Sequence, residues 1–77
     1  MIQSLVHINF SARKEEDWEK ARRELGKIFR KEPYGNFVDI YADNVESVLK
    51  KLRESEVFKR IEIVKNPNYV AWIQIYL

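Results

Sequence analysis

Residues 4–31, SLVHINFSARKEEDWEKARRELGKIFRK, contain the change of hydrophobic period on which the fold depends. Up to Phe10 the apolar residues alternate with polar ones and place Val6, Ile8 and Phe10 on one side, as in a half-buried β-strand. From about residue 13 the apolar residues follow steps of three and four, which indicates an amphipathic helix. The sequence therefore predicts a strand over 4–11, with Ser11 as a candidate N-cap, and a helix over 13–31.

The charges along residues 13–31 support the helix. Acidic residues gather near its start and basic residues near its end, as the helix dipole favours. Gly26 is the one misfit, because glycine in a helix interior costs about 1 kcal/mol relative to alanine. Close approach of a neighbouring segment would explain it.

The same two periods recur over the rest of the chain. Turn residues at 33–36 end the helix, and alternation over 37–43 predicts a second strand. A second helix to about residue 55 follows, with Asp43 or Asn44 as its cap. Strands over 58–65 and 69–77, joined by a turn at 66–68, complete a single domain over residues 1–77.

These elements predict an α+β two-layer sandwich of βαβαββ order, with a four-stranded mixed sheet and two helices packed on one face. If both helices lie in right-handed crossovers, the strands advance in one direction, which leaves the orders 1-2-3-4 and 1-2-4-3. Charge on the third strand suits a sheet edge, so we expect the order 1-2-4-3. The expected core includes Leu25, Ile40, Ile63 and Ile73.

This predicted topology resembles the fold of the C-terminal domain of translation initiation factor three and of small archaeal chromatin proteins. The resemblance is one of strand and helix order, and it assigns no functional residue to this chain.

The amino-acid composition excludes several classes of function. The 77 residues include no cysteine, so a disulfide framework, a thiolate nucleophile and a sulfur-ligated metal are excluded, and a cytoplasmic location is the expectation. No stretch approaches the length of a membrane span or a signal peptide, so we expect no membrane partner. The net charge of +2 is too small to argue for nucleic-acid binding by itself.

The sheet face opposite the helices is the distinctive surface that the pattern predicts. Aromatic side chains on an open sheet can stack unpaired bases, or they can pair across strands and stiffen the sheet. We expect the open face to present His7, Asn9, Phe37, Asp39, Tyr41, Arg60, Glu62, Val70, Trp72, Gln74 and Tyr76. The candidate binding residues among them are Phe37, Tyr41, Arg60, Trp72 and Tyr76.

Catalytic and metal sites have weaker support. His7 and Asp39 could be neighbours on the first two strands, and a histidine oriented by a carboxylate is a common general base. No nucleophile motif, metal-ligand spacing or phosphate-cradling glycine loop accompanies them in the sequence, so we expect no enzyme, metal or cofactor. The cations of residues 13–31 fit either a solvated helix face or a helix that contacts phosphates.

Three functions remain open. The first is a small non-enzymatic α/β domain, either a binding module or a scaffold without evolved function. Local propensity, pattern, capping and edge charge agree throughout, as in a computationally designed scaffold. The second is a domain that binds single-stranded RNA or DNA on its aromatic sheet face, and the third is a homodimerisation module.

Overall fold

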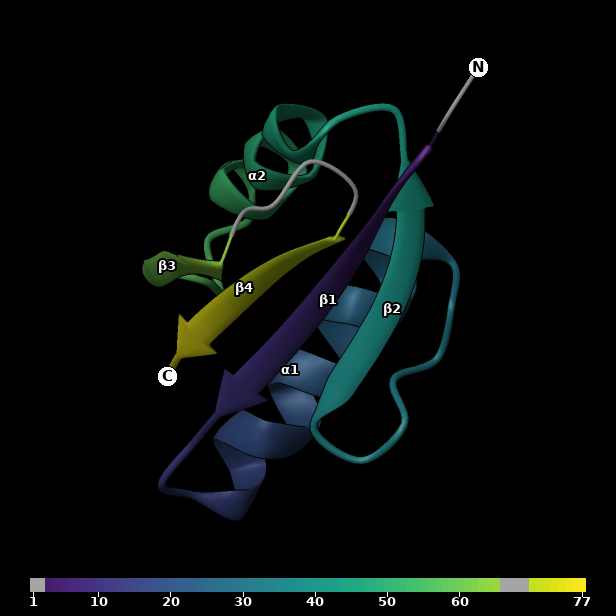
Figure 1. Ribbon diagram of the computed structural model, residues 1–77. Helices are drawn as coiled ribbons and strands as arrows, with labels where there is room; N and C mark the ends of the chain where they lie inside the picture. The colour runs from purple at the N-terminus through teal and green to yellow at the C-terminus, as the bar shows by residue number, and fades with distance from the viewer. Residues whose placement is uncertain (1–2, 66–69) are drawn as a thin grey trace.

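A computed structural model describes residues 3–65 and 70–77 and shows a sheet with two helices behind it (Figure 1). The elements follow one another in βαβαββ order, which confirms the predicted α+β class. They are β1 (Ser4–Ser11), α1 (Glu15–Phe29), β2 (Phe37–Ala42), α2 (Val45–Glu54), β3 (Arg60–Lys65) and β4 (Val70–Tyr76). The turn predicted at 66–68 lies outside the described residues.

The sheet is mixed, but its strand order is β2-β1-β4-β3, so the predicted order 1-2-4-3 was wrong. β1 pairs antiparallel with β2 on one side and parallel with β4 on the other, while β3 pairs antiparallel with β4. The right-handed crossover rule governs parallel strands, and the connection from β1 to β2 is antiparallel. The resemblance to the C-terminal domain of translation initiation factor three and to small archaeal chromatin proteins depended on the predicted strand order. Because that order was wrong, the resemblance no longer holds.

Residues 30–36 explain why β2 lies antiparallel to β1. The segment runs back along α1, where the Arg22 side chain donates to the Pro33 carbonyl at 3.4 Å, and then turns at residues 34–37. Its end is fastened to the end of β1, since the Phe10 N–H donates to the Asn36 carbonyl at 2.9 Å. The Asn36 side-chain amide also donates to Asn9 Oδ1 at 2.9 Å. β2 therefore starts where β1 finishes.

Of the two helices, α2 begins with a side-chain cap and α1 does not. Asn44 caps α2 as predicted, because its Oδ1 accepts a hydrogen bond from the Ser47 N–H at 2.8 Å. Ser11 does not cap α1, which starts after Lys14 without a side-chain cap. Ser11 instead stays in β1, where its carbonyl accepts from the Leu77 N–H at 2.9 Å. Pairing with the C-terminal strand thus keeps Ser11 in β1, and the helix begins later than expected.

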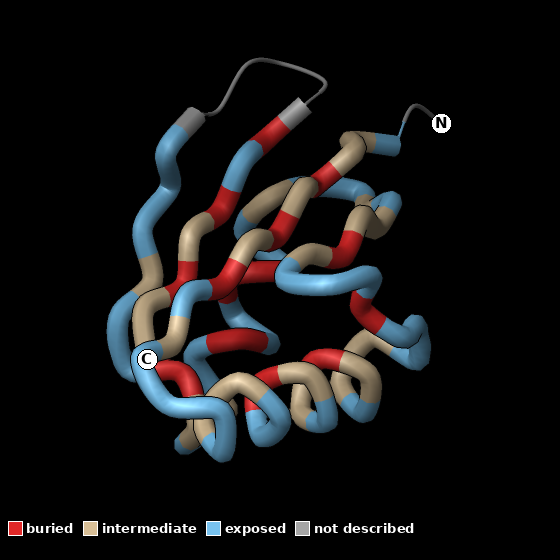
Figure 2. Tube along the Cα trace, turned by 90° about the horizontal axis from the view of Figure 1, so that it is seen from below, coloured by how far each residue is buried: buried red, intermediate tan, exposed pale blue. Residues whose placement is uncertain are grey.

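The core lies between the helices and one face of the sheet, where the buried residues form a continuous layer (Figure 2). Leu25 and Ile73 are fully buried, as predicted, and Ile40 is partly buried and packs against the core. Ile63 was wrongly assigned to the core, since its side chain is 42% exposed. Its register with Ile73 gives it the correct face, but it lies on an edge strand next to a β-bulge and has a neighbouring strand on one side only.

The structure does not require the glycine at position 26. A Cβ there would approach the Lys31 carbonyl oxygen and Pro33 Cδ at 3.9 Å, which is ordinary van der Waals contact. We therefore expect Gly26→Ala to raise the free energy of unfolding by about 0.5–1 kcal/mol, because alanine restricts the unfolded chain and favours helix. Urea titration of the two proteins measures the change.

The second glycine is the matched control for this substitution. Gly35 has a φ of +62°, a conformation that side chains with a Cβ disfavour, so Gly35→Ala is expected to destabilise the protein. If Gly26→Ala also lowered stability, the close approach of Lys31 and Pro33 to α1 would be tighter than these distances indicate.

Candidate binding face

The face of the sheet opposite the helices carries the predicted set of side chains, because residues on the core face alternate with them along every strand. The register places Asp39, His7 and Trp72 in one row across β2, β1 and β4. Asn9 lies between Phe37 and Gln74 in the next row. The side chain of Val70 is outside the described ones. We call this surface the open face.

Four rings make a continuous cluster on the open face. The ring centroids of Tyr34 and Phe37 are 5.9 Å apart, those of Phe37 and His7 are 5.1 Å apart, and those of His7 and Trp72 are 5.5 Å apart. The last pair meets edge to face at 89°. We call these four residues the ring cluster, which crosses from the loop before β2 over β2 and β1 to β4.

The two ends of the ring cluster are the accessible ones. Tyr34 is 80% exposed and Trp72 is 39% exposed, whereas Phe37 and His7 between them are half-buried. A tight turn holds Tyr34 against β2, since the Tyr34 N–H donates to the Phe37 carbonyl at 2.8 Å and the Phe37 N–H donates back at 3.2 Å. Gly35 supplies the positive φ at the first central position of this turn. The ring cluster is therefore fixed by backbone as well as by ring contacts.

His7 and Asp39, which the sequence left as possible neighbours, are directly paired across the antiparallel strands β1 and β2. His7 Nδ1 and Asp39 Oδ1 are 2.5 Å apart, and both side chains are partly exposed. The other contacts of the imidazole are with the rings of Phe37 and Trp72. This arrangement orients the imidazole within the ring cluster.

The five candidate binding residues lie at three separate locations on the open face. Phe37 and Trp72 belong to the ring cluster, where His7 joins them. Tyr41 lies apart, at the other end of β2, where it pairs with Leu5 and is 67% exposed. The remaining two, Arg60 and Tyr76, form a separate pair in which the guanidinium carbon lies 5.0 Å from the ring centroid.

Sequence reasoning missed Tyr34 as a site residue. The residue lies in a segment read as a turn, and turn chemistry says where the chain reverses without saying which surface its side chains join. The available signal was Gly35-Asn36 next to an alternating strand, a pattern typical of a tight hairpin-like turn. Such a turn folds Tyr34 back beside Phe37.

Charge on the open face is nearly balanced. The positive charge of Arg60 is set against the negative charges of Asp39 and Glu62, with His7 counted as neutral. Lys31 adds a cation at the β2 edge, where its Nζ donates to the Asp39 carbonyl oxygen at 2.6 Å. This contact also covers part of the free edge of β2 and hinders pairing with another strand there.

Tyr76 has a perturbed ionisation that can be tested. The pKa of Tyr76 is raised above the ordinary value of 10.0, first by the hydrogen bond that the phenol donates to the Glu62 carboxylate. Partial desolvation of the phenol and the negative charge of Glu62 raise this pKa further, whereas the positive charge of Arg60 lowers it. The contact therefore stabilises the fold below about pH 10 and loses its contribution as pH rises through the raised pKa. Glu62→Gln is expected to lower the pKa of Tyr76.

The measurement is an ultraviolet titration of tyrosinate absorbance. Because the chain has four tyrosines, the Tyr76 signal is the difference between each protein and the same protein carrying Tyr76→Phe. An unchanged titration in Glu62→Gln would contradict the assignment of the shift to this carboxylate.

Neither helix in residues 3–65 and 70–77 has the length and apolar character needed to cross a membrane. In the same part of the chain, no three histidine or carboxylate side chains gather into a potential metal site. Comparison of the chain with protein-family models, with curated proteins and with solved structures gives no match.

Proposed function

We propose that this chain is a small non-enzymatic binding module whose open face stacks the unpaired bases of single-stranded nucleic acid. The observation that carries the proposal is the ring cluster, four neighbouring rings from three strands and the loop before β2, on the face of the sheet opposite the helices. A ring platform of this kind suits flat ligands, because every base offers a π-face.

The exposures within the ring cluster support stacking at two positions. Tyr34 and Trp72 are accessible at its ends, while Phe37 and His7 hold them at a fixed spacing from within. A platform fixed before binding loses little side-chain entropy when a ligand arrives. Each stacked base contributes about 1–3 kcal/mol by alanine substitution.

The Arg60–Tyr76 pair gives the open face a second feature suited to this ligand. Arginine stacks on bases and contacts phosphates, and here the guanidinium carbon already lies over a ring on the same face. The low net charge of the face indicates that stacking, with a modest salt dependence, supplies most of the affinity there.

The experiment uses Trp72 fluorescence in a Trp18→Phe background, so that one tryptophan reports. A mixed-sequence single-stranded oligonucleotide of about 12 nucleotides covers the site sizes common for such platforms. Titration is expected to quench the emission saturably, and the same strand annealed to its complement is expected to quench it much less. Absence of saturable quenching by either DNA or RNA would refute the proposal.

A homodimer closed through the open face is the competing outcome. In that case the Trp72 emission would already be blue-shifted without ligand and would shift to the red on dilution. Light scattering on an eluting sample would give twice the monomer mass, and Trp72→Asp would restore monomers because a buried unpaired carboxylate is costly. That result would replace the nucleic-acid proposal.

A further inference from the structure

A cleft on the helix side of the molecule lies beside the last turns of α1 and the loop that follows them. It has a volume of about 380 Å³. Four of its lining residues are cationic and two are anionic, namely Arg22, Arg23, Arg30, Lys31, Glu19 and Glu32. The formal charge of this lining is therefore +2, which contrasts with the nearly balanced open face.

Arg22 has a hydrogen-bonding group that the protein leaves unused. Its guanidinium lies 5.1 Å from the Trp18 ring centroid, and one terminal nitrogen donates to the Pro33 carbonyl at 3.4 Å. The Nε atom is buried and has no hydrogen-bond partner among the residues that the structure describes. A buried donor without an acceptor is unusual in folded proteins, and because Arg22 lines the cleft, an anion bound there would lie beside this guanidinium.

Arg30 provides a second, independent observation. It ends α1 with a φ of 54° and a ψ of 35°, the left-handed conformation in which helices usually place glycine. Nonglycine residues held in this region tend to mark functional sites. Arg30 also lines the same cleft.

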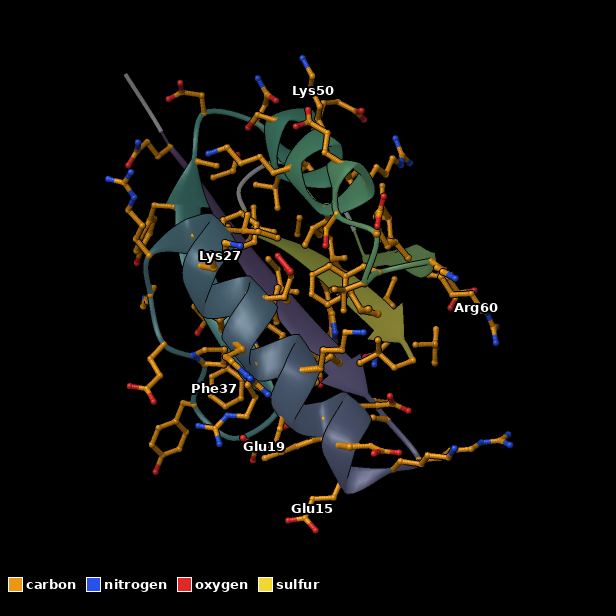
Figure 3. All side chains as sticks on the ribbon, turned by 180° about the vertical axis from the view of Figure 1, so that it is seen from behind. Glu15, Glu19, Lys27, Phe37, Lys50 and Arg60 are labelled. Atoms are coloured by element: carbon orange, nitrogen blue, oxygen red, sulfur yellow. The ribbon has the colours of Figure 1, made fainter. Side chains whose placement is uncertain are left out.

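The cleft and the ring cluster are consecutive along the chain. Pro33 lines the cleft and accepts the Arg22 hydrogen bond, and the next residue, Tyr34, is the first ring of the ring cluster. Seen from behind, Phe37 lies beyond the edge of α1, level with the turns between Glu19 and Lys27 (Figure 3). A strand that crosses the open face toward Tyr34 therefore leaves the sheet at the edge where the cleft begins.

We propose that this cleft binds a phosphate group of the nucleic-acid strand whose bases stack on the ring cluster. This assignment rests on the proposed function and adds a separate site to it. Arginine is suited to the role, because its planar fork matches the oxygens of a phosphate in two parallel hydrogen bonds. The cleft supplies the positive charge that the open face lacks.

The first measurement tests the cleft without any nucleic acid. Inorganic phosphate is titrated into the protein while the Nε–H resonance of Arg22 is followed by NMR. The buried position of this group slows exchange with water, so the resonance is observable, and saturable binding is expected to shift it. The absence of any shift would overturn the assignment.

The second measurement is the salt dependence of oligonucleotide affinity, with single-stranded DNA and RNA as separate arms. Arg23→Ala and Arg30→Gly each remove one cation from the cleft, and the glycine suits the backbone at position 30. Each is expected to reduce the slope of log affinity against log salt by about 1. Lys50→Ala is the matched control, since Lys50 is an exposed cation on α2, away from the cleft (Figure 3), and its slope is expected to stay unchanged.

The outcomes separate the two proposals. Oligonucleotide binding with unchanged slopes in Arg23→Ala and Arg30→Gly would overturn the cleft assignment and leave the open face as the binding surface. A phosphate shift at Arg22 with no oligonucleotide binding would refute the proposed function and, with it, the nucleic-acid source of the phosphate. Equal slope changes in the Lys50→Ala control would mean a general charge effect and would also overturn the assignment.

Discussion

Ile73→Ala is expected to lower the free energy of unfolding by about 2–5 kcal/mol, a large share of the stability of a domain of this size. Ile73 is fully buried on β4, an interior strand of the sheet, between Ile8 on β1 and Ile63 on β3. Truncation removes buried methyl groups and leaves a cavity that strands on both sides prevent from closing. Urea titration followed by circular dichroism measures the loss.

Ile63→Ala is the matched control, since it makes the same chemical change on the neighbouring strand. The two isoleucines face each other in register on the same side of the sheet, but Ile63 is 42% exposed at the edge. We expect this substitution to cost about 1 kcal/mol or less. A larger loss for Ile63→Ala than for Ile73→Ala would mean that β4 does not occupy the interior of the sheet.

The faces of the strands were predictable because alternation is a local property. Val6, Ile8 and Phe10 are fully buried, and the polar His7 and Asn9 lie on the other side, as the period of two requires. Helix faces were predictable for the same reason, with Leu25 buried on α1. These assignments depend on a few adjacent residues and hold for any arrangement of the strands.

The strand order was not predictable because it depends on where a loop takes the chain. Residues 30–36 could have continued from α1 into a parallel strand or returned along it, and their composition only indicates that a helix ends. The return is held by contacts between distant segments, such as Asn36 with Asn9 and Lys31 with the Asp39 carbonyl. Nothing in either local pattern specifies these contacts.

The candidate site was predictable in part for related reasons. The open-face positions of Phe37 and Trp72 follow from alternation, and their connection through His7 follows from β1 lying between β2 and β4. The predicted strand order would instead have put β2 between β1 and β4, with Phe37 and Trp72 on adjacent strands and His7 at the sheet edge. The basic cleft was invisible to the sequence, which shows only cations along a helix, because it forms where the returning loop meets α1.

Trp72→Ala is expected to weaken binding of a mixed-sequence single-stranded oligonucleotide by about 1–3 kcal/mol, or roughly 5- to 150-fold. Trp72 is the largest ring in the ring cluster and lies on β4, where its neighbours hold it in place without covering it. Because the lost interaction is stacking, the slope of log affinity against log salt is expected to stay unchanged. Fluorescence anisotropy of a labelled oligonucleotide measures both quantities.

Tyr41→Ala is the control for this substitution, because it removes an exposed aromatic ring from the open face outside the ring cluster. If contiguous stacking carries the affinity, Tyr41→Ala should cost several-fold less than Trp72→Ala, and Trp72→Phe should retain most of the binding. Equal losses for Tyr41 and Trp72 would mean that the face binds through general apolar contact, without a defined platform. A loss in Trp72→Ala that grows as salt falls would assign the affinity to charge and would contradict stacking as its main source.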